Sequence, residues 1–290
     1  MAGHGIGRRR ILWAASTGVV GVATGVFGGA ARGYTQTLRQ RREVRALRAD
    51  EWATYVNAVI QLNASGQYDR FVGQYAQQFP RVAGSSQWLP YLRELLFRFE
   101  NAVQAVEASA TVPYWDAQRD YAAPEKSAVL GPGFVGGNGD SRTGVVASAG
   151  RFGAWQVSVP ERHQLRRKFE RGDRISGWAS PAAVSSFLAN TTTYHQLRPG
   201  IEYQFSGPVH TGIGGDMAGR YAPADPVFWL HIANVDRLWS VWQSRAGNMA
   251  QYDGPNADAS SAKVTDRIVG SDSVTVKDVL DISALGYRYV

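Results

Sequence analysis

Apolar side chains return at helical spacing in three stretches of the chain. In each stretch the apolar positions lie three or four residues apart, which places them on one face of an α-helix. The three faces consist of Trp52, Val56, Val59, Ile60 and Leu62; of Trp88, Leu92, Leu95, Phe99, Val103 and Val106; and of Phe228, Ile232, Val235, Trp239 and Trp242. This pattern predicts helices near residues 51–64, 90–108 and 226–245, the first with Asp50 as its N-cap. The sequence therefore predicts a mainly α domain with little sheet.

Between and before these helices the pattern is less regular. Residues 117–180 are typical of long loops, and they include the Gly-rich segment GPGFVGGNGD at 131–140. That segment lacks the Lys-Ser/Thr ending and the strand–helix context of a phosphate-binding loop, so we exclude a nucleotide site there. The basic run HQLRRKFERGDR, which starts at His163, is typical of a solvated helix face. Residues 34–49, rich in Arg and Gln, are typical of a basic, solvated linker.

The net charge of +7 is confined to one end of the chain. The first 50 residues hold nine Arg and two acidic residues, whereas the remainder holds 22 basic and 22 acidic residues. A body without net charge has no basic surface of the kind that binds nucleic acid, and we expect no nucleic-acid partner. The absence of Cys excludes disulfides, thiolate ligands and thiol nucleophiles.

An export signal is predicted at the N-terminus. Arg8-Arg9-Arg10 precede an apolar run from Ile11 to Ala30, and small residues follow. Adjacent arginines are typical of a twin-arginine leader, and the run is about long enough to span a bilayer if it is not cleaved. We expect residues 1–33 to be this signal or an anchor, 34–49 a linker and 50–290 one domain. The protein would lie on the outer side of a bacterial cytoplasmic membrane and contact it only through an uncleaved leader.

Two segments carry a family resemblance. Residues 205–243 resemble the second copper-binding segment of tyrosinases, plant polyphenol oxidases and molluscan haemocyanins, through Gly214, Gly215, Met217, Asp225, Pro226, Phe228, Trp229, His231, Asn234, Asp236, Arg237 and Trp239. Residues 66–116 resemble the first, through Tyr68, Asp69, Phe71, Val72, Leu89, Pro90, Arg93, Glu100, Pro113, Tyr114, Trp115 and Asp116. The resemblance covers roughly residues 50–290 and implies a tyrosinase-like four-helix bundle with long loops. Within it, Arg93, Asp236 and Arg237 are expected to form ion pairs that keep the helices in register.

The metal ligands of this type-three copper family are mostly absent. The family holds two copper ions with three His each, and the resemblance places these six positions at Tyr75, Ala83, Leu92, Ser206, His210 and Ile232. Only His210 retains an imidazole. His231 lies beside Ile232, about 100° round the helix, and should not replace it. From these residues we expect no metal ligands and no cofactor, with copper binding doubtful.

A cavity should remain between the four helices where the metals are missing, a common place for a small-molecule ligand or substrate. Its candidate acid/base groups are His210, Glu202 and Tyr75, and its other expected residues are Ser206, Ala83, Leu92, His231 and Ile232. The favoured hypothesis is a copper-free protein with acid/base chemistry, such as isomerisation, hydration or cyclisation, on a small aromatic or apolar biosynthetic intermediate. Two alternatives stay open: a non-catalytic pseudoenzyme that binds a ligand or partner, and a copper-dependent phenol oxidase, which the ligand positions disfavour.

The leader makes the first testable prediction. Changing Arg9→Lys together with Arg10→Lys should retain the protein in the cytoplasm, because twin-arginine export depends on the arginine pair and not on charge alone. Cell fractionation with an antibody against the chain measures this. Export of the double variant at the normal level would indicate ordinary secretion or a simple anchor.

Overall fold

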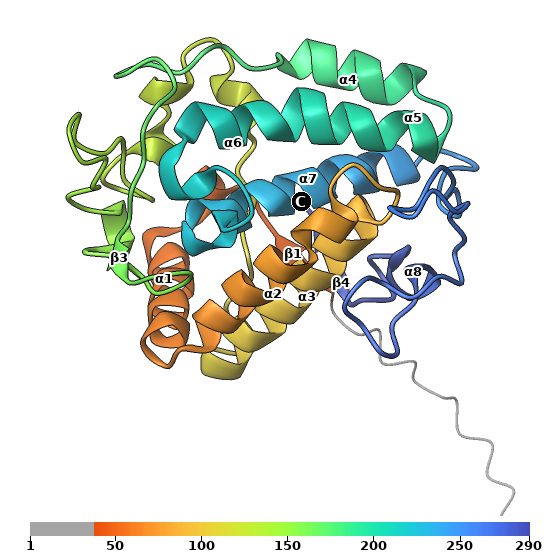
Figure 1. Cartoon of the computed structure of the whole chain (residues 1–290), viewed down its shortest axis with the longest axis horizontal. Coiled ribbons are helices and arrows are strands. Elements are labelled where there is room, and N and C mark those ends of the chain that lie inside the picture. Colours follow the sequence, from red (N-terminus) through yellow and green to blue (C-terminus); the bar gives the residue numbers. More distant parts are fainter. Residues whose placement is uncertain (1–37) are drawn as a thin grey trace, which may run out of the picture. The chain divides into compact units, whose positions relative to one another are not determined.

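The computed structural model describes residues 38–290, and the expected leader lies outside these residues (Figure 1). Within the described part, no helix is long and apolar enough to cross a membrane. The α-helices are α1 (Ala49–Ala64), α2 (Gln67–Val82), α3 (Trp88–Val106), α4 (Pro181–Asn190), α5 (Tyr194–Pro199), α6 (Gly207–Ile213), α7 (Val227–Gln243) and α8 (Val276–Val279). The strands are β1 (Arg39–Arg41), β2 (Gln156–Val157), β3 (His163–Gln164) and β4 (Tyr287–Tyr289). The prediction of a mainly helical fold with little sheet is confirmed.

The three predicted helices are present as α1, α3 and α7, each within about two residues of its expected bounds. The structure adds α2, which the sequence analysis did not identify. Its buried positions Tyr68, Val72, Tyr75 and Ala76 do follow helical spacing. Pro80 in the last turn obscures the signal, since a proline without an N–H normally ends a helix.

Helices α3 and α7 form the centre of the domain, and α1, α2 and α4 pack around them (Figure 1). Helix α7 is buried on nearly all sides, including its polar positions His231, Asn234 and Asp236. At the α3–α7 contact the rings of Phe99 and Trp229 stack with centroids 3.5 Å apart. Such close packing of large rings fixes the relative position of the two helices.

A further wall of the bundle is a continuous helical stretch from α5 to α6 that contains a π-helical segment, Gly200–Ser206 (Figure 1). The Gly207 N–H donates to the Glu202 carbonyl, five residues back, and Pro208 follows without an N–H. π-Helical turns are rare, and they are frequent at functional sites. This one carries Glu202 and Ser206, two of the residues that the sequence analysis placed in the central cavity.

The expectation of a linker at residues 34–49 is wrong from Arg39 onward. Strand β1 pairs in parallel with β4 at the far end of the chain, with Arg39 opposite Tyr287. The Arg41 guanidinium is completely buried, 2.9 Å from a Glu100 carboxylate oxygen. The partner strand lies more than 240 residues away in sequence, so no local pattern could reveal that these arginines are interior.

The basic run at His163 is not a solvated helix. His163 begins the two-residue strand β3, and Arg167 is completely buried. Nε and Nη2 of Arg167 each donate to a carboxylate oxygen of Asp225 at 2.7 Å, and Nη1 donates to the carbonyls of Val135 and Gly137 in the Gly-rich loop. The Gly-rich segment therefore surrounds a cation with carbonyl oxygens, the opposite polarity to a phosphate loop.

A buried carboxylate, Asp236 on α7, joins four segments of the chain. It accepts hydrogen bonds from Arg93 on α3 at 2.5 Å and from Arg41 on β1 at 3.3 Å. The hydroxyls of Tyr287 and Tyr289 on β4 donate to it at 2.7 and 2.6 Å. Burial would raise the pKa of Asp236, but the charges of Arg93 and Arg41 outweigh burial and hold that pKa below its ordinary value. The expected Arg93–Asp236 pair is thus confirmed, whereas Arg237 lies instead near Asp116, at 3.4 Å.

Asp236→Asn should destabilise the fold by about 3–5 kcal/mol, because it leaves the buried Arg93 guanidinium without a counter-charge, whereas Arg41 keeps Glu100. Urea unfolding followed by circular dichroism measures this loss. The control is Asp272→Asn at an exposed position, which should change stability by less than about 0.5 kcal/mol. Equal stability of the two variants would show that Asp236 does not hold the segments together.

Candidate functional site

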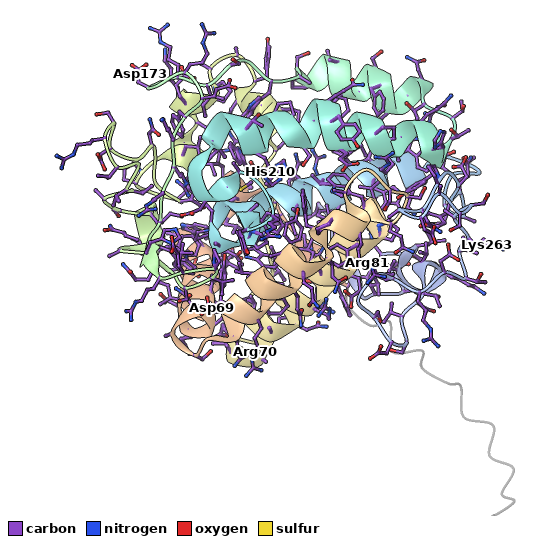
Figure 2. The ribbon with its side chains drawn as sticks, viewed as in Figure 1. Asp69, Arg70, Arg81, Asp173, His210 and Lys263 are labelled. Carbon is purple, nitrogen blue, oxygen red and sulfur yellow. The ribbon has the colours of Figure 1, made fainter. Side chains whose placement is uncertain are left out.

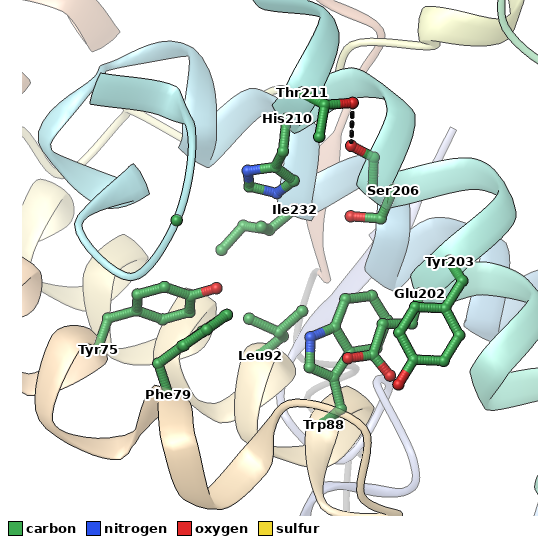
Figure 3. A pocket seen from close by; sticks show the side chains of 12 residues that line it. Tyr75, Phe79, Trp88, Leu92, Glu202, Tyr203, Ser206, His210, Thr211 and Ile232 are labelled. Carbon is green, nitrogen blue, oxygen red and sulfur yellow. Dashed lines mark hydrogen bonds between the residues drawn. The ribbon is translucent and has the colours of Figure 1, made fainter. Parts of the chain in front are cut away.

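A cavity of about 200 Å³ lies between α2, α3, α7 and the wall that contains α6 (Figure 3). In Figure 2, Asp173 and Lys263 lie at the outer edges of the view, whereas His210, which is partly buried, lies over the middle of the ribbon. The cavity is lined by Tyr75, Phe79, Trp88, Leu92, Glu202, Tyr203, Ser206, Gly207, His210, Thr211, Gly219 and Ile232. A cavity of about 150 Å³ is known to hold benzene, so this one has room for a single aromatic ring.

Most of this lining is apolar, and four of its side chains form two pairs in which the residues lie one helical turn apart. Tyr75 and Phe79 project from α2, Trp88 and Leu92 from α3, and Ile232 from α7. Burial raises the pKa of the Tyr75 hydroxyl, so this group stays neutral and can donate a hydrogen bond to a ligand. The sequence analysis placed Tyr75, Leu92 and Ile232 here and missed Phe79 and Trp88. Their spacing of four residues from Tyr75 and Leu92 was the available signal.

Among the residues that the structure describes, His210 supplies the only imidazole that lines the cavity. Its Nδ1 lies 2.8 Å from the Met217 carbonyl oxygen, and a carbonyl only accepts, so the proton is assigned to Nδ1. Nε2 is then left with a free lone pair. Burial lowers the pKa of His210, against the opposing effects of the Met217 carbonyl and Asp225. The geometry therefore presents a neutral ring whose Nε2 can accept a proton.

The Met217 carbonyl is held in place by the two glycines before it. Gly214 and Gly215 adopt φ values of 63° and 58°, in the left-handed region that favours glycine. A Cβ atom on either would lie within 2.3 Å of a backbone oxygen of the segment 166–168, so the turn packs directly on that segment. The Gly-Gly-x-Met sequence thus fixes the ring orientation of His210.

His231 lies behind the cavity wall. Its Nε2 is 2.8 Å from the Ser206 Oγ, and its ring centroid is 5.0 Å from that of His210. The ring is buried, and its Nδ1 has no partner in the part of the chain that the structure describes. Burial, assisted by His210, lowers the pKa of His231 well below its ordinary value, so this imidazole is neutral. Ser206 lines the cavity and connects it to His231.

Glu202 reaches the cavity with both carboxylate oxygens occupied. One accepts the Gly84 N–H at 2.8 Å, and the other pairs with Arg198, one helical turn earlier. Burial raises the pKa of Glu202, although the Gly84 N–H and Arg198 act against it. Arg198 was not identified from the sequence, but its i,i+4 spacing from Glu202 was a usable signal. Ala83 ends α2 next to Gly84 and is not among the lining residues.

The chain was compared with known proteins. The family model described as the common central domain of tyrosinase matches residues 65–245. A tyrosinase of Streptomyces glaucescens is 33% identical over 272 residues, with 84% of this chain and 96% of the relative covered. A tyrosinase of Streptomyces antibioticus is 34% identical over 230 residues, which cover 71% of this chain and 83% of the relative. The structure of a polyphenol oxidase from Thermothelomyces thermophila superposes with a TM-score of 0.73 at 22% identity, over 88% of this chain and 90% of that one, which supports the fold.

These relatives overturn the expectation that the protein has no cofactor. Its homologues are named tyrosinases, so copper is the cofactor that its family implies. The donor set around the cavity does not fit a centre with three imidazoles for each of two ions. His210 and His231 are the two imidazoles present, and Leu92 and Ile232 offer hydrocarbon where the family has ligands. Within residues 38–290, no group of three or more His, Cys, Asp or Glu is arranged to hold a metal ion.

The family assignment rests on sequence and fold together. The matched central domain spans more than half of the chain and contains the four elements that enclose the cavity. The Streptomyces relatives extend the similarity over most of both chains. This chain belongs to the tyrosinase family.

Proposed function

We propose that the central cavity binds a small aromatic or apolar molecule and that His210 acts on it as an acid/base. The reaction class is proton transfer, as in an isomerisation, hydration or cyclisation of a biosynthetic intermediate. The observation that carries this proposal is the hydrogen bond from His210 Nδ1 to the Met217 carbonyl. It fixes the tautomer and the orientation of the ring, and it leaves Nε2 as an acceptor in a cavity of the size of one ring.

The other polar groups have supporting roles. Ser206 Oγ can donate to or accept from a bound molecule while it keeps its contact with His231. The Tyr75 hydroxyl is a neutral donor on the opposite helix. Glu202 was a candidate acid/base in the sequence analysis. Because both of its carboxylate oxygens already accept hydrogen bonds, it is better suited to hold Gly84 and Arg198 at the edge of the cavity than to exchange protons. The apolar walls exclude water, which strengthens each of these hydrogen bonds.

Two other functions compete with this proposal. The relation to tyrosinases favours copper-dependent oxidation of phenols, and copper bound in stoichiometric amount, with oxidation that a chelator abolishes, would establish it and contradict acid/base catalysis by His210. A non-catalytic protein that binds a ligand or partner would use the same cavity without turnover. Metal analysis and a turnover assay on the same preparation separate all three.

His210→Ala should reduce turnover of the substrate by about 10²–10⁴-fold, which is the usual contribution of a general acid/base. The substrate is sought first by screening phenols, terpenoid-like apolar compounds and aromatic acids for binding. Ligand affinity should fall much less than turnover, because the apolar walls are unchanged. The fold should lose about 1–3 kcal/mol as the Met217 carbonyl loses its donor.

His195→Ala, at an exposed position on α5, is the matched control and should leave turnover and stability unchanged. Turnover that persists in His210→Ala would contradict the proposed role. Loss of stability with unchanged ligand binding and no turnover in either protein would favour the pseudoenzyme.

The neutral state of the buried imidazoles makes a pH prediction. Because the pKa of His231 is lowered by folding, its contribution to stability is complete above the unfolded value of about 6.5 and is lost as the pH falls toward its folded pKa. His231→Gln, which can still bond Ser206, should reduce the loss of stability between about pH 6.5 and 5 by up to about 1.4 kcal/mol per pH unit. Urea unfolding at a series of pH values measures the slope. An unchanged slope would mean that His231 takes up its proton equally in the folded and the unfolded chain, which contradicts a lowered pKa; His195→Gln is the control.

A further inference from the structure

Within residues 38–290, one charged side chain lines the cavity, and that charge is already paired. Among the lining residues only Glu202 is ionic, and its partner Arg198 lies four residues earlier on the same helical wall. Both side chains are nearly buried, with exposed fractions of 8% for Arg198 and 9% for Glu202. The imidazoles of His210 and His231 are neutral. The interior that a ligand would meet therefore has no net charge.

We propose that the Arg198–Glu202 ion pair makes the cavity selective for uncharged ligands: it accepts single-ring compounds without net charge and rejects carboxylates and ammonium groups. This inference rests on the proposed function, since it specifies which small aromatic molecules the cavity takes. It makes Arg198 and Glu202 specificity-determining residues rather than catalytic ones.

The physical reason is the energy of an unpaired charge in a largely apolar site. A ligand carboxylate would lose its hydration and meet the Glu202 carboxylate, while the Arg198 guanidinium is already committed to Glu202. A ligand ammonium would find both Glu202 oxygens occupied, one by Arg198 and one by the Gly84 N–H. A neutral hydroxyl meets no such penalty, and it can donate to the free Nε2 of His210.

The pair also lies where a substituent on the ring would reach it. Figure 3 shows His210 on one side of the cavity and Glu202, with Tyr203, on another. Tyr203 follows Glu202 on the π-helical segment and is 59% exposed, so this side of the cavity reaches solvent. The Arg198 guanidinium lies 5.7 Å from the centre of the Tyr203 ring. A ring whose hydroxyl is bound at His210 would direct its para substituent toward the ion pair.

The test uses three phenols of nearly equal size that differ in one charge: 4-hydroxybenzyl alcohol, 4-hydroxybenzoate and 4-hydroxybenzylamine. Their affinities are measured at pH 7.5 by ligand-observed NMR titration of the full chain. The neutral alcohol should bind at least about tenfold more tightly than the anion and the cation, a difference of about 1.4 kcal/mol.

Single variants of the pair should redirect this preference. Glu202→Gln frees the Arg198 charge, so binding of 4-hydroxybenzoate should improve at least about tenfold relative to the alcohol. Arg198→Gln frees the Glu202 charge and should favour 4-hydroxybenzylamine in the same way. The double variant Arg198→Gln with Glu202→Gln has no charge and should restore the preference for the alcohol, which keeps the test decisive if one single variant does not fold.

The matched control is an ion pair with the same i,i+4 spacing, Glu94 and Arg98 on α3. The Arg98 Nε lies 2.7 Å from a Glu94 carboxylate oxygen, and neither residue lines the cavity. Glu94→Gln and Arg98→Gln should leave the ratios of the three affinities unchanged. If the neutral alcohol does not bind the unmodified protein, the selectivity for uncharged single-ring compounds is contradicted, whereas the proposed function is decided separately by the wider ligand screen and the turnover of His210→Ala. If the three phenols bind with equal affinity, or if the charge variants do not redirect the preference, the ion pair does not set selectivity, while the proposed function stands.

Discussion

The buried carboxylate of Asp236 is the interaction on which the rest of the fold depends. It is shared by Arg93 from α3, Arg41 from β1 and two tyrosine hydroxyls from β4. Without Asp236 the buried Arg93 guanidinium would have no counter-charge in an interior that cannot solvate it, so the segments stabilise one another. The residues just before α1 and the last residues of the chain are thereby fixed against the α3–α7 pair. That pair in turn forms two of the walls of the cavity.

The remaining walls of the cavity show how a helical fold can position polar side chains. The π-helical segment between α5 and α6 brings Glu202 and Ser206 to the cavity, and α6 continues with His210. The glycine pair after α6 lets the chain turn back so closely that the Met217 carbonyl meets the His210 ring. Backbone geometry therefore decides which imidazole nitrogen is available, since the carbonyl selects the Nδ1 proton.

The family of this protein and the side chains in its cavity determine different properties. The relation to tyrosinases establishes the fold and makes copper the cofactor that the family implies. The side chains present determine what the cavity itself can do: two neutral imidazoles, one of them behind a serine, and hydrocarbon at Leu92 and Ile232. A ring-sized apolar cavity with a single oriented acceptor is suited to proton transfer on a neutral molecule, which is why the proposals concern His210 and the charge at the rim.

The sequence by itself determined the long helices α1, α3 and α7 but not α2, since the spacing of residues such as Leu92 and Ile232 depends only on the period of the helix. It also determined that His210 is the imidazole at the cavity, through the motif in which it lies. Tertiary structure alone decided the interior role of Arg41 and Arg167, because their partners Glu100 and Asp225 lie about 60 residues away and a basic run has no local feature that distinguishes a buried from a solvated guanidinium. It also decided the tautomer of His210, because that depends on a carbonyl brought back by a turn. Periodic burial is a local property of the chain, whereas the pairing of buried polar groups is fixed only when distant segments meet.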